Sequence, residues 1–262
     1  MSVSRIPAEP AVAPAGASRH FPGSPVGVLV LHGWTGNALE MTFLASRLAA
    51  AGYTVSLPRL PGHGTNGGDF LQTTWQDWLR RAIDAYLDLA RECDTVFVAG
   101  LSMGGVLATI LASIFPIPRL ALYAPAIVIK NRLIHLTPVV RLFVKRFAVP
   151  HDEEQVEPAM RGLAREYHRF QWIAPAYHLR KLQRLAAKRL RHVRSDALIV
   201  VSQADESVPV SVADVFSRKA RAGTVERLEL TDSPHVLVNG IDKERVATAT
   251  VEWFQSSDRI SS

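Results

Sequence analysis

Apolar and polar positions follow one another in blocks along this chain of 262 residues. Six short apolar runs are mostly continuous, as expected for strands that helices cover on both faces; they span residues 26–33, 53–59, 95–100, 119–125, 197–203 and 225–231. Between them, apolar residues recur at helical spacing, at residues 38–51, 75–92, 103–115, 209–221 and 243–256. Pro209 suits the first turn of its helix. This alternation predicts an α/β fold with a doubly wound, mostly parallel sheet.

One long segment interrupts the alternation. From about residue 126 to 196 the pattern is helical, basic and amphipathic, and no strand is expected within it. We expect this segment to form a helical cap inserted between two strands of the sheet. Residues 1–24 contain prolines but no continuous apolar run, which predicts a flexible tail. The expected organisation is therefore a tail at 1–24 and one domain at 25–262, with the cap at about 126–196.

Composition narrows the class of protein and its location. Hydrophobic residues make up 48% of the chain, which is enough for a large core and argues against global disorder. The single cysteine, Cys93, excludes an internal disulfide and a cysteine-based metal site. The apolar run of about 7–15 residues that a signal peptide needs is not found, and no stretch reaches the ~18 apolar residues of a membrane span. We therefore expect a soluble, cytoplasmic protein.

The sequence GLSMG (100–104) places Ser102 between two glycines, after an apolar strand and before a predicted helix. A sharp strand-to-helix turn of this form projects a serine hydroxyl out of the sheet, and the flanking glycines let strand and helix pack closely around it. The N–H of the next residue, Met103, then lies at a helix N-terminus, where it can stabilise a developing negative charge. We therefore predict that Ser102 is a nucleophile.

A serine nucleophile needs a base and an acid that orients the base. His235 follows the last predicted strand, and Asp205 follows the strand before it, so both lie where open α/β sheets build their sites. We choose Asp205 as the acid, with Glu206 and Asp232 as competitors. The order serine, acid, histidine is that of one known arrangement of these three residues.

The sequence HGWTG (32–36) follows the first predicted strand and offers a second oxyanion donor, the backbone N–H of Trp34. Its histidine, His32, is expected to brace this loop rather than to take part in catalysis. The same interpretation holds for His63 in PGHGT (61–65), a turn expected near the site.

These motifs together resemble those of the α/β-hydrolase family. The stretches that carry the resemblance are VGVLVLHGWTGN (26–37), AGYTVSLPRLPGHGT (51–65), FVAGLSMGG (97–105) and SPHV (233–236). They look like the branch of bacterial monoacylglycerol lipases and small carboxylesterases, over roughly residues 25–124 and 197–255. The resemblance implies the α/β-hydrolase fold, with Ser102 as nucleophile, Asp205 as acid, His235 as base, and the amides of Trp34 and Met103 as oxyanion donors.

The resemblance is poor in the cap, between Ile127 and Ser195, and Glu166 lies there in no matching motif. The net charge is +6, but it is unevenly distributed. Residues 126–196 hold 15 Lys and Arg against 6 Asp and Glu, so the cap has a net charge of +9 and the remainder −3. Two interpretations stay open. In one, the cap helices pack over the site and expose ordinary solvated charge. In the other, apolar residues of 136–150 and 177–194 line an acyl tunnel while cations contact an anionic lipid surface.

The helix expected at 177–194 should present one apolar face and one basic face. The apolar face consists of Leu179, Leu182, Leu185, Ala186, Leu190 and Val193. It is the face that would cover the site in either interpretation.

We expect a serine hydrolase that cleaves carboxylic esters through an acyl-enzyme, with monoacylglycerols or similar fatty-acyl esters as substrates and without a metal or organic cofactor. A short-chain carboxylesterase, or a thioesterase, acyltransferase or haloperoxidase with the same triad, is the alternative. A dehalogenase is disfavoured because the nucleophile is Ser102 rather than an aspartate. A non-enzymatic ligand-binding protein is disfavoured by the complete triad.

The basic pI of about 9.8 is weak evidence for nucleic-acid binding, and no nucleic-acid partner is expected. The sequence does not indicate an oligomeric state.

Overall fold

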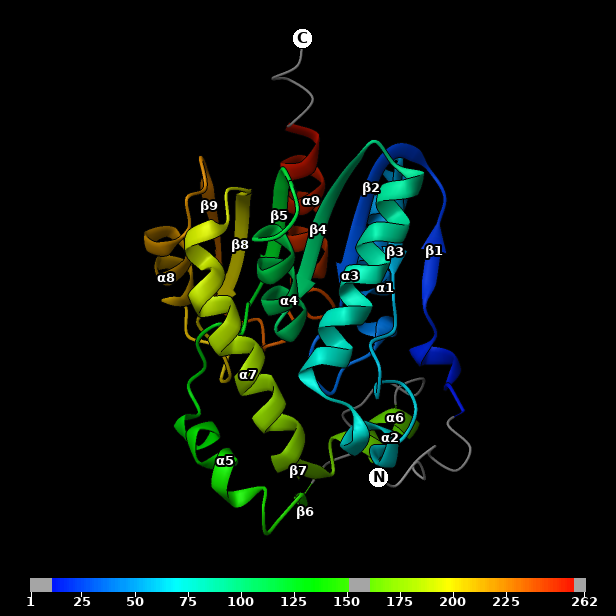
Figure 1. Ribbon diagram of the computed structural model, residues 1–262. Coiled ribbons are helices and arrows are strands. Elements are labelled where there is room, and N and C mark those ends of the chain that lie inside the picture. The colour runs from blue at the N-terminus through cyan, green and yellow to red at the C-terminus, as the bar shows by residue number, and fades with distance from the viewer. Residues whose placement is uncertain (1–10, 151–160, 257–262) are drawn as a thin grey trace.

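The computed structural model describes residues 11–150 and 161–256. Its main feature is a seven-stranded sheet with the order β1-β3-β2-β4-β5-β8-β9, in which every neighbouring pair is parallel except β1 and β3 (Figure 1). The strands are β1 (Arg19–Phe21), β2 (Ser24–Leu31), β3 (Tyr53–Leu57), β4 (Thr95–Leu101), β5 (Arg119–Tyr123), β8 (Asp196–Ser202) and β9 (Val225–Leu230). The predicted doubly wound, mostly parallel sheet is confirmed.

Helices cover both faces of this sheet. α3 and α4 lie on the face toward the viewer in Figure 1, while α1 and α9 pack against each other on the far face. The helices are α1 (Ala38–Ala50), α3 (Trp75–Glu92), α4 (Met103–Ala112), α8 (Val212–Lys219) and α9 (Lys243–Gln255). α8 begins later than predicted, because Pro209 forms a turn that precedes the helix, with its carbonyl accepting from the Val212 N–H.

The core consists of the sheet strands and the inner helix faces. The central strands β4, β5 and β8 are buried along nearly their whole length, and β2 is buried over its C-terminal half, where Val28, Leu29, Val30 and Leu31 are all 0% exposed. A strand buried on both faces needs a continuous apolar run rather than an alternating one, which is why these strands were predictable.

The N-terminal segment differs from the expected tail. Residues 19–21 form β1, which pairs antiparallel with β3, and Ser24 already begins β2. The expectation of a flexible segment is therefore wrong for residues 19–24, and residues 1–10 lie outside the described part of the chain. A three-residue edge strand with the sequence RHF is too short to show a strand pattern.

The cap lies between β5 and β8. Its elements are η2 (Arg132–Leu136), α5 (Thr137–Val140), β6 (Arg146–Ala148), α6 (Arg161–Tyr167), β7 (Phe170–Trp172), α7 (Ile173–Arg189) and η4 (Leu190–His192). The expectation that it contains no strand is wrong, because β6 and β7 form a small antiparallel pair. Each of these strands has three residues, and β6 is exposed throughout, so neither produces the apolar run that predicts a strand.

α7 is the long helix of the cap and runs from β7 up along the flank of α4 toward α8 (Figure 1). The face predicted to be apolar is buried at Leu179, Leu182 and Ala186, and the burial continues through Leu190 and Val193; Leu185 is partly buried. The predicted amphipathic helix is therefore confirmed. Within residues 11–150 and 161–256, no helix is both long and apolar enough to cross a membrane.

Candidate active site

Ser102 lies on a tight turn between the end of β4 and the start of α4. Its backbone has φ 52° and ψ −110°, a conformation that side-chain-bearing residues rarely adopt and that persists where the surroundings enforce it. Added Cβ atoms would lie 2.4 Å from the Gly104 carbonyl oxygen at position 100 and 2.1 Å from the Leu31 carbonyl oxygen at position 104. Both glycines of the GLSMG motif are therefore required by close backbone packing around the turn.

A chain of hydrogen bonds joins Ser102, His235 and Asp205. The Ser102 Oγ lies 2.9 Å from His235 Nε2, and His235 Nδ1 lies 2.8 Å from Asp205 Oδ2. In the tautomer that satisfies both contacts, the serine hydroxyl donates to Nε2 and the Nδ1–H donates to the carboxylate. The structure thus brings Ser102 together with two residues that follow it by more than a hundred positions in the sequence, Asp205 and His235.

Asp205 is 1% exposed and is held in a turn of its own making, because its Oδ1 accepts from the backbone N–H groups of Ser207 (2.7 Å) and Val208 (3.0 Å). Burial alone would raise the pKa of the Asp205 carboxyl, but the hydrogen bond from His235, the His235 charge and the two N–H donors together hold this pKa below its ordinary value. The carboxylate is therefore ionised and oriented toward the imidazole.

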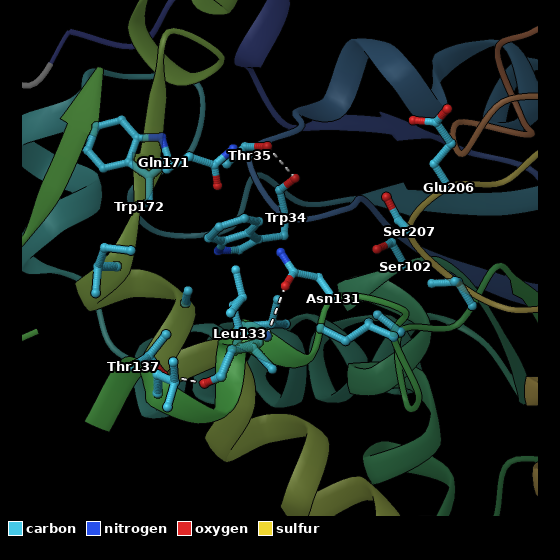
Figure 2. Close-up of a pocket in the computed structure, with 18 of the residues that line it drawn as sticks. Trp34, Thr35, Ser102, Asn131, Leu133, Thr137, Gln171, Trp172, Glu206 and Ser207 are labelled. Carbon is cyan, nitrogen blue, oxygen red and sulfur yellow. Dashed lines mark hydrogen bonds between the residues drawn. The ribbon is translucent and has the colours of Figure 1, made fainter. Parts of the chain in front are cut away.

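The two competing acids lie elsewhere. Glu206 and Asp232 are both exposed, and the Glu206 carboxylate turns away from Ser102 in Figure 2. The hydrogen bond that His235 Nδ1 makes is to Asp205. Of the three candidate acids, the geometry places Asp205 beside the histidine.

The loop after β2 lies against the Ser102 turn. A Cβ added to Gly33 would be 3.6 Å from the Ser102 Cβ, so the following peptide, which carries the Trp34 N–H, lies beside the serine. Thr35 continues the loop in the left-handed region, with φ 58°, and its hydroxyl donates to the Trp34 carbonyl at 2.7 Å. Met103 is the first residue of α4, where backbone N–H groups have no partner within the helix.

His32 braces this loop, as its position predicts. The fully buried ring donates from Nδ1 to the Gly33 carbonyl at 2.9 Å, and its Nε2 accepts the Leu60 N–H at 3.1 Å. Burial lowers the pKa of His32 to about 4, although the bond to Gly33 opposes this shift. His63 packs against it with ring centroids 5.1 Å apart, and burial also lowers the pKa of His63 well below its usual value. Both rings are therefore neutral near pH 7.

A cavity of about 760 Å³ extends from Ser102 and His235 into the cap (Figure 2). Its wall is mostly apolar and comes largely from the cap, with Ile129, Leu133, Ile134, Leu136, Val140, Phe147, Trp172, Ile173, Ala176 and Leu179. Polar side chains lie at fewer positions: Thr35, Asn131, Thr137, Gln171, Glu206 and Ser207. Such a cavity suits a mostly apolar ligand with a polar end near the serine.

The sequence offered no assignment for the polar residues of the cavity. Asn131 caps η2, because its Oδ1 accepts from the Leu133 N–H at 2.9 Å, and this leaves its amide NH₂ beside Trp34 in Figure 2. An asparagine before a helical pattern is a recognisable N-cap signal, but nothing in the sequence shows that its amide faces a cavity. Glu166 does not line the cavity; its carboxylate accepts from the Gly67 N–H at the start of α2 (Gly67–Gln72).

The fold and this arrangement define a class, the serine hydrolases built on an α/β sheet, and comparison with known proteins agrees. The model of the "Alpha/beta hydrolase family" matches residues 28–249, and the chain belongs to this family. It is 35% identical over 238 residues to a thermostable monoacylglycerol lipase of Bacillus sp. (strain H-257), covering 88% of this chain and 90% of that protein. It is 27% identical over 231 residues to a carboxylesterase of Bacillus subtilis (strain 168), covering 86% of this chain and 89% of that protein.

Solved structures show the same fold. A structure from work on the metagenome-derived lipolytic enzymes LipS and LipT has a TM-score of 0.85 and 28% identity, covering 94% of this chain and all of that one. The monoacylglycerol lipase of Paleococcus ferrophilus has a TM-score of 0.72 with 17% identity, covering 91% of this chain and 98% of that one. The expected family and fold are confirmed.

Proposed function

We propose that this chain is a serine ester hydrolase that cleaves monoacylglycerols or similar fatty-acyl esters through an acyl-enzyme. The observation that carries the proposal is the hydrogen-bonded chain of Ser102, His235 and Asp205 at the inner end of a largely apolar cavity. The relatives named as a monoacylglycerol lipase and a carboxylesterase support the reaction class.

In the proposed mechanism, Ser102 Oγ attacks the ester carbonyl while His235 Nε2 takes the hydroxyl proton. The Asp205 carboxylate holds the Nδ1–H and stabilises the imidazolium that forms. The backbone N–H groups of Trp34 and Met103 donate to the oxyanion, where one well-placed donor is typically worth about 3–4 kcal/mol. His235 then protonates the leaving alcohol, and a water molecule, activated by the same histidine, cleaves the acyl-enzyme.

The proposed mechanism uses side chains and backbone groups of this chain and needs no metal or organic cofactor. No group of three or more metal-ligating side chains that could hold an ion occurs within residues 11–150 and 161–256. We assign the acyl chain to the apolar cavity wall of the cap and the alcohol to the polar positions near Ser102. A short-chain carboxylesterase remains the alternative, supported by the Bacillus subtilis relative.

The test of this function is a hydrolysis panel run on the wild type and on Ser102→Ala. The panel contains 1-monoacylglycerols and p-nitrophenyl esters of short to long acyl chains, with a diacylglycerol as a size control. Preference for medium or long monoacylglycerols that is lost in the variant supports the proposal. Preference for short simple esters favours the carboxylesterase, and hydrolysis that persists in Ser102→Ala overturns the assignment.

We also propose that the cap contacts an anionic lipid surface from which the substrate enters. The cap tip, defined as residues 132–147, carries exposed apolar side chains, with Leu133 68%, Leu142 69% and Phe143 83% exposed. Cations are interspersed among them at Arg132, Arg141, Lys145 and Arg146. Exposed apolar side chains flanked by cations are typical of peripheral membrane contact.

Leu133, Leu136, Val140 and Phe147 of the cap tip are exposed and also line the cavity. The tip is therefore a thin wall between the cavity and the surroundings. Lys188 near the end of α7 and Arg191 in η4 lie around one hollow with Lys219 of α8. In Figure 1, α8 lies far from α5 and β6. We therefore assign lipid contact to the tip and not to the whole basic face of α7.

Co-sedimentation with phosphatidylglycerol and phosphatidylcholine vesicles at low and high salt tests this contact. Phe143→Ser and Lys145→Gln should weaken binding to anionic vesicles. Lys188→Gln also removes one positive charge, but at the end of α7 that is remote from the cap tip, and it should leave this binding unchanged. Equal loss in both charge variants, or no binding at low salt, would contradict the assignment. As part of this proposal we retain a cytoplasmic location and the cap at about 126–196 inserted into one domain. The domain boundary expected at residue 25 moves toward the N-terminus, because β1 (Arg19–Phe21) belongs to the sheet.

A further inference from the structure

Residues 126–130 form a linker at the start of the cap, between β5 and η2. The linker contacts both the turn that carries Ser102, here the nucleophile turn, and the loop at 205–208, here the acid loop. At one end, the Ala126 N–H donates to the Ser102 carbonyl at 3.1 Å. At the other end, the Lys130 N–H donates to the Ser207 carbonyl at 2.9 Å, and the Lys130 ammonium donates to the Asp205 carbonyl at 2.6 Å. Five residues of linker, 126–130, therefore span the distance between the two loops.

A buried side chain of the cap holds the first end of this linker. Gln183 lies on the otherwise apolar face of α7 and is 8% exposed. Its Nε2 donates to the Ala126 carbonyl at 2.8 Å. A buried amide costs free energy unless it is hydrogen-bonded, so a glutamine among leucines on this face indicates a specific requirement at Ala126.

The nucleophile turn needs such support because Ser102 has an unfavourable backbone conformation. The Ser102 N–H donates to the Tyr123 carbonyl at 2.9 Å, just before the linker, while its carbonyl accepts from Ala126 at the start of the linker. The surroundings that hold this strained residue therefore include the chain leading into the cap. The same linker also lines the cavity through Ala126 and Ile129.

We propose that Gln183 and Lys130 are positioning residues that set the separation of Ser102 from the Asp205–His235 pair through the linker 126–130. Gln183 fixes the linker at the nucleophile end, and Lys130 fixes it at the acid end. The cap is then part of the framework of the triad as well as a wall of the cavity. This inference rests on the proposed function, because it assumes that Ser102 reacts with an ester.

The test compares Lys130→Met and Gln183→Leu with the wild type in hydrolysis of p-nitrophenyl butyrate. Neither side chain lines the cavity, so KM should change by less than about twofold, while kcat should fall about tenfold or more, because a displacement of about 1 Å can cost about 100-fold. Lys130→Arg, which restores a cationic donor, should recover most of the loss. Lys188→Met serves as the control, since it removes a cation at the far end of α7.

A second readout separates this inference from the proposed function. The rate at which a fluorophosphonate labels Ser102 measures activation of the nucleophile without any choice of ester. Labelling that is slowed in both variants and normal in Lys188→Met supports the inference. Normal labelling and kcat in Lys130→Met and Gln183→Leu overturn it, whereas a wild type that is not labelled overturns the proposed function instead. If Gln183→Leu fails to fold, Lys130→Met and its arginine rescue decide the question.

Discussion

Replacement of His32 by glutamine should change how the stability of the protein depends on pH. The imidazole is fully buried, and its Nε2 must be unprotonated to accept the Leu60 N–H. Glutamine can place an acceptor oxygen near the same position but does not titrate. The comparison therefore isolates the cost of keeping His32 neutral inside the loop that carries the proposed oxyanion donor.

The magnitude follows from the two pKa values of His32, about 4 in the folded protein against 6.5 in the unfolded chain. Between these values the unfolded chain binds a proton that the native protein does not, so native stability falls as pH falls. The limiting slope is about 1.4 kcal/mol per pH unit. Between about pH 7.5 and about pH 5, His32 should therefore remove about 2 kcal/mol from the free energy of unfolding.

The wild type alone does not show this slope cleanly. Burial raises the pKa of Glu40 to about 7, and a carboxyl with a raised pKa contributes the opposite sign, because its native form binds the extra proton. His63 contributes the same sign as His32, since its pKa is also lowered. The difference between the wild type and His32→Gln cancels the Glu40 contribution to first order. The His63 contribution cancels only in part, because the charge on His32 is one cause of the lowered pKa of His63.

Urea unfolding followed by tryptophan fluorescence at several pH values measures this difference. The free energy of unfolding of the wild type, relative to the variant, should fall by about 2 kcal/mol from about pH 7.5 to about pH 5. A difference that stays constant with pH would refute the reasoning, because it would mean that His32 titrates alike in the folded and unfolded states.

Three further substitutions test the packing and electrostatics of the site. Gly104→Ala would place a Cβ 2.1 Å from the Leu31 carbonyl oxygen, so kcat/KM should fall about 100-fold or more as the serine turn shifts; steady-state kinetics on a soluble ester measures this. Tyr167→Phe removes a hydroxyl that bonds two backbone groups of the 62–65 loop, and urea unfolding should show a loss of about 2 kcal/mol. Asp205→Asn should lower kcat by about 10⁴ by favouring the wrong histidine tautomer, and the kinetics should show little change in KM.

The elements of the sheet were predictable because burial on both faces demands long apolar runs, and because the helices between them are amphipathic. The proximity of Ser102, Asp205 and His235 was predictable because each follows the carboxyl end of a strand, where the topology alone brings distant residues together. Ser102 carried an additional signal, since glycines are required where backbones approach as closely as they do at positions 100 and 104.

The cap was predictable only in outline. Its β6 and β7 strands have three residues each and are defined by pairing with one another rather than by a local pattern. The hydrogen-bond partners of Glu166 and Gln183 lie 99 and 57 positions away in the sequence. Nothing in the local sequence specifies such contacts. The edge strand β1 was missed for the same reason, because its identity depends on the neighbouring strand β3.

The most direct test of the account is to locate the covalent adduct of a phosphonate analogue of a monoacylglycerol. The wild type should take up one equivalent of the analogue, and peptide mapping by mass spectrometry should place the adduct on Ser102. His235→Ala should react far more slowly, because it lacks the base that activates the hydroxyl. An adduct on another residue, or undiminished ester hydrolysis by a protein fully modified at Ser102, would contradict the account.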